Sequence, residues 1–60
     1  MTKDAQVIED WINRINEEGV NLSKWEISFM ESVTDQFQRR KWISDKQEDI
    51  IERIYTEKVP

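Results

Sequence analysis

The sequence at residues 22–27 reads Leu22-Ser23-Lys24-Trp25-Glu26-Ile27, which is the pattern of a helix N-terminus. Ser23 and Glu26 have the Ser-x-x-Glu spacing of a capping box, in which each side chain accepts from the backbone N–H of the other residue. Leu22 and Ile27 occupy the two positions of a hydrophobic staple, which packs across the same turn. A helix is therefore predicted to begin at residue 24.

This helix is predicted to run over residues 24–40 with one apolar face. Its large apolar residues recur at helical spacing, and a chain this short needs such side chains to fill a core. We therefore expect the stripe to be core and not a ligand-binding surface. The stripe consists of Trp25, Phe29, Met30, Val33 and Phe37.

A preceding helix is predicted over residues 3–17, where apolar residues follow one another at spacings of three and four. Thr2 is a candidate N-cap, and Gly19, the only glycine, stands where a left-handed residue closes a helix. The apolar stripe of this segment comprises Ala5, Ile8, Trp11, Ile12 and Ile15.

A further helix is predicted over residues 45–57. Ser44 and Gln47 form a second capping box, of the Ser-x-x-Gln type, just before it. Ile43 precedes this box and is expected to pack under the junction between the second and third helices. The apolar stripe of the third helix comprises Ile50, Ile51, Ile54 and Tyr55.

These elements predict an all-α fold, a small three-helix domain. The chain has 60 residues, which is room for a single domain over residues 1–60. Connections of four or five residues favour antiparallel neighbours, so the second and third helices are expected to form a hairpin with the first helix packed across it. The sequence has no Cys for a disulfide, so helix packing must stabilise the fold.

The residue types that are absent restrict the chemistry. Without His or Cys there is no ready proton shuttle at neutral pH and no thiolate nucleophile. We expect no enzymatic activity, no metal and no cofactor. The adjacent acidic residues that remain as candidate acid–base groups are predicted to lie on polar helix faces or ends. These are Glu9/Asp10, Glu17/Glu18 and Glu48/Asp49.

The hydropathy pattern indicates where in the cell the protein is located. No apolar run approaches the roughly 18 residues of a membrane span, and the first five residues lack the apolar core of a signal peptide. The sequence therefore predicts a cytoplasmic protein that does not associate with a membrane.

Charge is distributed unevenly along the chain. The formal net charge is −4, yet residues 36–46 carry four cations against Asp45, a balance of +3. Within this stretch the candidate partner-binding residues are Arg39, Arg40, Lys41, Trp42 and Lys46. We expect Trp42 to be the most exposed of the three tryptophans, because it lies between two helices and off the periodic stripes.

Three interpretations of this basic segment stay open. The cations could complement the dipole at the end of the second helix while Trp42 caps the core. They could instead contact a protein, or bind single-stranded nucleic acid through charge and ring stacking. A helix-turn-helix DNA reader is disfavoured, because the outward residues of the third helix are acidic. These are Asp45, Glu48, Asp49, Glu52 and Glu57.

Two sequence elements together resemble a helical hairpin seen in small phage-encoded proteins, among them the accessory protein linked to the phage recombination helicase UvsW. The first element is Leu22-Ser23-x-Trp25-Glu26-x-x-Phe29-Met30-x-Ser32-Val33, and the second is Ile43-Ser44-x-Lys46-Gln47-x-x-Ile50-Ile51-x-Arg53-Ile54-Tyr55. The resemblance covers residues 22–57. It implies a phage or prophage origin and a role beside DNA replication, recombination or host takeover, and it supplies no catalytic residues.

The leading functional hypothesis is a non-catalytic accessory or inhibitor that binds a protein partner. Two alternatives remain. One is weak single-stranded nucleic-acid binding through the 39–46 segment. The other is a helical module whose exposed apolar residues serve self-association, with a homodimer completing a marginal core.

Overall fold

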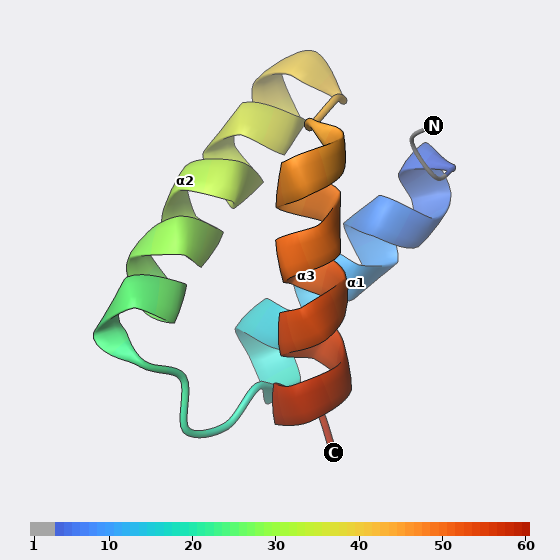
Figure 1. The fold of residues 1–60 in the computed structure, drawn as a ribbon. Coiled ribbons are helices and arrows are strands. Elements are labelled where there is room, and N and C mark those ends of the chain that lie inside the picture. Colours follow the sequence, from blue (N-terminus) through green and yellow to red (C-terminus); the bar gives the residue numbers. More distant parts are fainter. Residues whose placement is uncertain (1–3) are drawn as a thin grey trace.

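The computed structural model describes residues 4–60, and this part of the chain forms three α-helices and no strand. They are α1 (Ala5–Glu18), α2 (Lys24–Arg40) and α3 (Asp45–Lys58), shown in Figure 1. The helices α2 and α3 form an antiparallel hairpin, and α1 packs chiefly against α3. The predicted fold class is confirmed. The bounds of α2 are as predicted, whereas α1 begins at residue 5 and not 3.

Both predicted capping boxes are present. The backbone N–H of Ser23 donates to Glu26 Oε1 over 2.7 Å, and the N–H of Glu26 donates to Ser23 Oγ over 3.1 Å. At α3 the reciprocal bonds between Ser44 and Gln47 measure 2.8 and 3.1 Å. These bonds satisfy backbone donors that have no partner within the helix, and they set where α2 and α3 begin.

The cap of α1 is Asp4, whose carboxylate accepts from the backbone N–H of Gln6 over 2.8 Å. Asp is among the preferred N-cap residues, and a cap at residue 4 accounts for the later start of the helix. The predicted cap, Thr2, lies outside the described residues.

The conformation predicted for Gly19 is wrong. Its φ and ψ are −64° and 139°, which is extended backbone, and its N–H closes α1 by donating to the Ile15 carbonyl over 3.0 Å. A Cβ atom at this position would lie 2.6 Å from the Ile15 carbonyl oxygen and 2.9 Å from Leu22 Cδ1. Glycine is therefore required by a close approach of the chain. Among residues 4–60 the left-handed conformation is adopted by Asn21 (φ 57°) and Lys41 (φ 55°).

The core lies between the three helices and takes residues from each of them. Ile43, in the α2–α3 connection, is also fully buried, as predicted for the residue under the junction. The buried apolar residues are Ile8, Ile12, Ile15, Met30, Val33, Phe37, Ile43, Ile51 and Ile54. The predicted stripes of α1, α2 and α3 thus supply the core, with two members misplaced.

These two members are Ala5, which is exposed, and Trp25, which has 60% of its surface exposed. Ala5 is the first residue of α1 and precedes Ile8, the first buried residue of that helix. At 100° per residue, Trp25 lies roughly 140° around α2 from the buried Met30, so it cannot share the buried face. Its ring stacks on Phe29 instead, with centroids 5.3 Å apart.

The prediction that Glu48 faces outward from α3 is wrong, because this residue is only 5% exposed. It lies one turn before the fully buried Ile51 and therefore shares part of that face. Tyr55, two turns further along, stacks on Trp11 of α1, so this flank of α3 faces α1. Four of the five acids predicted to face outward from α3 are exposed, and Glu48 is the exception.

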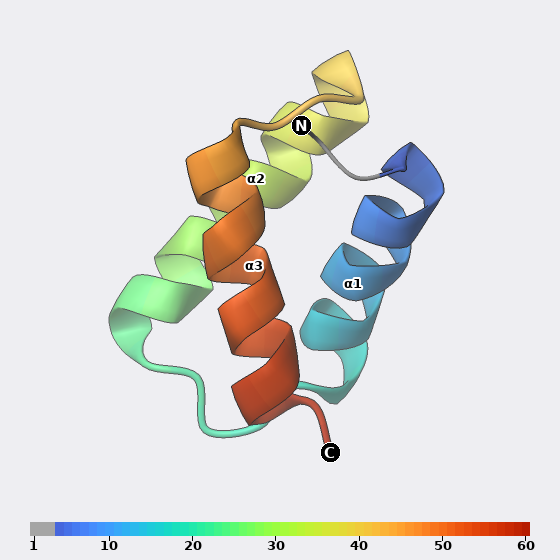
Figure 2. The ribbon, with the colours of Figure 1, turned by 45° about the vertical axis from the view of Figure 1, so that its right-hand side comes forward.

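The α1–α2 connection is hydrogen-bonded to the C-terminal end of α3. The Val20 N–H donates to the Lys58 carbonyl over 3.0 Å, and Lys58 Nζ donates to the Asn21 carbonyl over 3.1 Å. Lys58 Nζ also lies 3.7 Å from Glu26 Oε1. In Figures 1 and 2 the connection runs from beside the C-terminal end of α3 to the start of α2. These contacts hold the N-terminal end of α2 in place.

Candidate functional site

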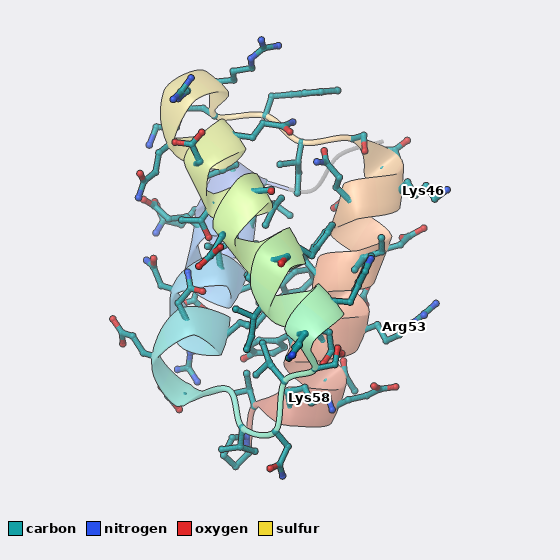
Figure 3. The ribbon with its side chains drawn as sticks, turned by 90° about the vertical axis from the view of Figure 1, so that its left-hand side faces the viewer. Lys46, Arg53 and Lys58 are labelled. Carbon is teal, nitrogen blue, oxygen red and sulfur yellow. The ribbon has the colours of Figure 1, made fainter. Side chains whose placement is uncertain are left out.

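The predicted partner-binding residues gather at one end of the molecule, where α2 turns into α3 (Figure 1). Arg39 and Arg40 end α2, and Lys46 is in the first turn of α3, where Figure 3 shows it projecting away from the helices. We refer to Arg39, Arg40, Lys41, Trp42 and Lys46 as the basic corner. The fold therefore brings all five residues to the same end.

A set of hydrogen bonds fixes the backbone of this corner. Lys41 adopts the left-handed conformation and donates its N–H to the Phe37 carbonyl over 2.7 Å. The Gln36 amide donates to the Trp42 carbonyl over 3.3 Å. The side chains of Gln36 and Gln47 also bond each other reciprocally, over 3.2 and 3.1 Å. The direction in which residue 42 leaves the turn is consequently well defined.

Gln36 is a positioning residue that the sequence analysis missed. A lone Gln within a helix has no distinctive pattern, and its partner Gln47 was assigned only to the capping box. In the structure Gln47 Oε1 accepts from both the Ser44 N–H and the Gln36 amide. The capping box and the α2–α3 contact therefore share one side chain.

The Trp42 side chain is 52% exposed, while the next residue, Ile43, is fully buried. The chain thus inserts Ile43 into the core and leaves the indole of Trp42 in solvent. The prediction that Trp42 is the most exposed tryptophan is wrong, because Trp25 exposes 60% of its surface. Trp11 is half-buried, with its ring 5.7 Å from that of Tyr55.

The four cations of the corner differ in their surroundings. Arg39 Nε lies 3.2 Å from Asp35 Oδ2, an exposed pair that contributes little to stability. Lys41 Nζ lies 5.6 Å from the centre of the Phe37 ring, within the range of a cation–π contact. Arg40 and Lys46 are exposed and form no ion pair among residues 4–60. Counting Asp35, four cations face two acids, a balance of +2.

A shallow open groove adjoins the corner along α2. It is lined by Ser32, Asp35, Gln36, Arg39 and Arg40. Its walls are polar and its shape is open, which suits contact with an extended surface better than enclosure of a small molecule. Within residues 4–60 no group of His, Cys, Asp and Glu side chains is arranged to hold a metal ion.

A second exposed apolar region surrounds the start of α2, and of its residues only Trp25 was predicted to lie in the core. Trp25, Ile27 and Val20 expose 60%, 49% and 50% of their surfaces. A groove beside Ile27 separates the end of α1 from α2. It is lined by Ile15, Asn16, Gly19, Leu22, Ile27, Met30 and Glu31. The predicted staple residues Leu22 and Ile27 thus border the same groove, and the helical phase of Trp25 is the signal that could have revealed its exposure.

Glu26 is the acidic residue of the capping box at the start of α2. Its pKa is lowered from the ordinary value of 4.5, chiefly because its carboxylate accepts the backbone N–H of Ser23. The charge of Lys58 acts in the same direction. This carboxylate serves the cap and the Lys58 contact, and it lies at the opposite end of α2 from the basic corner.

Comparison with known proteins gives no assignment: no family model, curated protein or solved structure matches the chain. Among residues 4–60, no helix combines the length and apolar character required to cross a bilayer. The resemblance to small phage hairpin proteins stays a prediction.

Proposed function

We propose that this chain is a non-catalytic binding protein whose basic corner contacts a protein partner. The observation that carries the proposal is the half-exposed indole of Trp42 on a backbone held by Gln36 and the left-handed Lys41. Trp and Arg dominate the energetics of protein interfaces. A ring on an ordered turn loses little conformational entropy on binding, which favours affinity.

The size of the domain is compatible with this role. Its accessible surface is 4337 Å², and a standard interface of roughly 800 Å² per partner would occupy about a fifth of it. Covering the indole of Trp42 would remove apolar surface from water at about 25 cal/mol per Å². Arg40 and Lys46 would then lie at the polar rim.

The class of partner follows from the resemblance and the charge distribution. Small phage hairpin proteins suggest a cytoplasmic factor of DNA replication, recombination or host defence, on which this chain acts as accessory or inhibitor. The exposed acids of α1 support the inhibitor variant, because they could face a basic nucleic-acid-binding surface and compete with nucleic acid for it. These acids are Glu9, Asp10, Glu17 and Glu18.

Affinity capture from the native host tests the proposal. The wild-type chain should recover a stoichiometric protein, and Trp42→Ala should recover much less of it. Trp25→Ala is the matched control, because it removes a comparably exposed indole at the other end of α2. Absence of a stoichiometric partner, or equal recovery by both variants, would contradict the proposal.

Single-stranded nucleic acid is a second candidate, favoured by the exposed Arg40 and Lys46 at the same end of the molecule as the exposed Trp42. The net charge of −4 and the Arg39–Asp35 pair weigh against it. An oligonucleotide that bound here would quench tryptophan fluorescence, with an affinity that falls steeply as salt is added. Lack of quenching at low salt would exclude this candidate.

A further inference from the structure

We infer that the outer face of α2 binds a second copy of this chain, with the two α2 helices antiparallel. This face comprises Lys24, Trp25, Ile27, Ser28, Glu31 and Ser32, all exposed. It lies on the side of α2 away from the core, and α2 stands in front of the other helices in Figure 3. The inference does not depend on a partner at the basic corner.

The apolar residues of this face lie on its two edges. Trp25 and Ile27 lie roughly 160° apart across the outer side of the helix, one on each side of Ser28. They expose 60% and 49% of their surfaces, more than the other large apolar residues of α2. The small side chains of Ser28 and Ser32 lie between these edges. A second helix can therefore approach closely while Trp25 and Ile27 flank it.

The charges of this face favour a second copy of the chain as the binding partner, with its α2 helix antiparallel. Lys24 and Glu31 are two turns apart on the edge that carries Ile27, and neither forms an ion pair among residues 4–60. In an antiparallel pair crossing near Ser28, Lys24 lies across from Glu31 of the second copy, within about one residue, and the reciprocal pair forms by symmetry. In a parallel pair Lys24 and Glu31 of the two copies would lie at different heights along the contact, so no Lys24–Glu31 pair would form between them.

The same antiparallel crossing also brings the Trp25 ring against the second copy. Trp25 lies across from Ser32 of the second copy, again within about one residue, so each indole covers a small residue of the opposite helix. The Lys24 and Glu31 charges cancel within the face, although the whole chain carries −4. Two copies can therefore approach here without the repulsion expected elsewhere on the acidic surface.

The two exposed tryptophans thus belong to separate surfaces. The helix α2 has 17 residues and is roughly 25 Å long, with Trp25 near its start and Trp42 beyond its end. A crossing near Ser28 leaves the basic corner uncovered. Because one helix per chain forms the contact, the buried area is below the standard interface size, and we expect dissociation in the range of tens of micromolar.

Sedimentation equilibrium with two charge reversals tests the inference. Lys24→Glu and Glu31→Lys should each raise the dissociation constant about tenfold or more, because each brings two pairs of like charges together. An equimolar mixture of the two variants should dimerise as tightly as the wild type, since the pairs are then complementary. Glu at the start of a helix is favourable, so Lys24→Glu should fold normally.

Two further variants separate this surface from the basic corner. Trp25→Ala should weaken the dimer, whereas Trp42→Ala, which removes a similarly exposed indole, should leave the dissociation constant within about twofold. A wild-type chain that is monomeric at about 1 mM would overturn the inference, since the expected constant is far lower. A mixture of the two charge variants that stays monomeric would overturn the antiparallel pairing.

Discussion

Replacing Gly19 by Ala tests whether the close approach of the chain at the end of α1 requires glycine. Because the φ of Gly19 is −64°, Ala has no conformational penalty there, and the substitution alone would stabilise the protein by about 0.4–1 kcal/mol through the unfolded chain. The new Cβ would, however, lie 2.6 Å from the Ile15 carbonyl oxygen. This oxygen belongs to the backbone and accepts the bond that closes α1, so relief requires the chain to shift.

Overpacking of this kind costs about 1–3 kcal/mol, which exceeds the gain from the unfolded chain. We therefore expect a net destabilisation of about 1 kcal/mol, which lowers the melting temperature by roughly 4–8 °C in a domain of this size. Thermal unfolding followed by circular dichroism measures it. Glu18→Ala, at the exposed neighbouring position, is the control and should change little. A higher melting temperature for Gly19→Ala would refute the steric explanation.

Three further substitutions test the caps and the core. Ser23→Ala removes the acceptor of the Glu26 N–H and should cost about 1 kcal/mol in chemical denaturation. Val33→Ala, at a fully buried site, should cost about 1–3 kcal/mol, against less than about 0.5 kcal/mol for the half-exposed Ile27. Since the pKa of Glu26 is lowered, its carboxylate stabilises the fold fully above pH 4.5 and progressively less as the pH falls through the lowered pKa. Glu26→Gln should retain the cap, because Gln47 fills the same position at α3. It should also reduce the loss of stability at acidic pH. A Gln variant whose stability has the wild-type pH dependence would contradict this role of the Glu26 carboxylate.

The starts of α2 and α3 could be predicted because their signals are local. Ser23 and Ser44 each meet their capping partner three residues later, and these bonds need nothing from the rest of the fold. The buried Ile43 was likewise predictable, since an apolar residue at a short connection has a core beside it. Local chemistry also placed the basic corner at the α2–α3 turn.

The misplaced residues depend on how the helices pack. Trp25 has an apolar spacing of four from Phe29, but its position at the edge of the stripe places it outside the interface. Glu48 looks polar in sequence, yet it lies on the flank of α3 that α1 covers. The role of Gly19 depends on the return of the chain past Ile15 and Leu22, which its neighbours in sequence do not reveal.

The candidate site was predicted in composition but not in detail. The sequence shows four cations and an indole, whereas the pairing of Arg39 with Asp35 and the support of Trp42 by Gln36 appear only in three dimensions. Exposure of Trp42 was expected because it lies between helices, and 52% of its surface is indeed exposed. The rank order of the tryptophans was missed because Trp25 was assigned to the core.

The most direct test of the proposed binding role measures Trp42→Ala in two assays on the same preparation. One is the affinity for the captured partner, and the other is the free energy of unfolding. The half-exposed indole predicts a loss of about 2 kcal/mol or more in binding, with stability changed by less than about 1 kcal/mol. Loss of more than about 3 kcal/mol of stability with binding intact would mark Trp42 as a core residue and contradict the proposal.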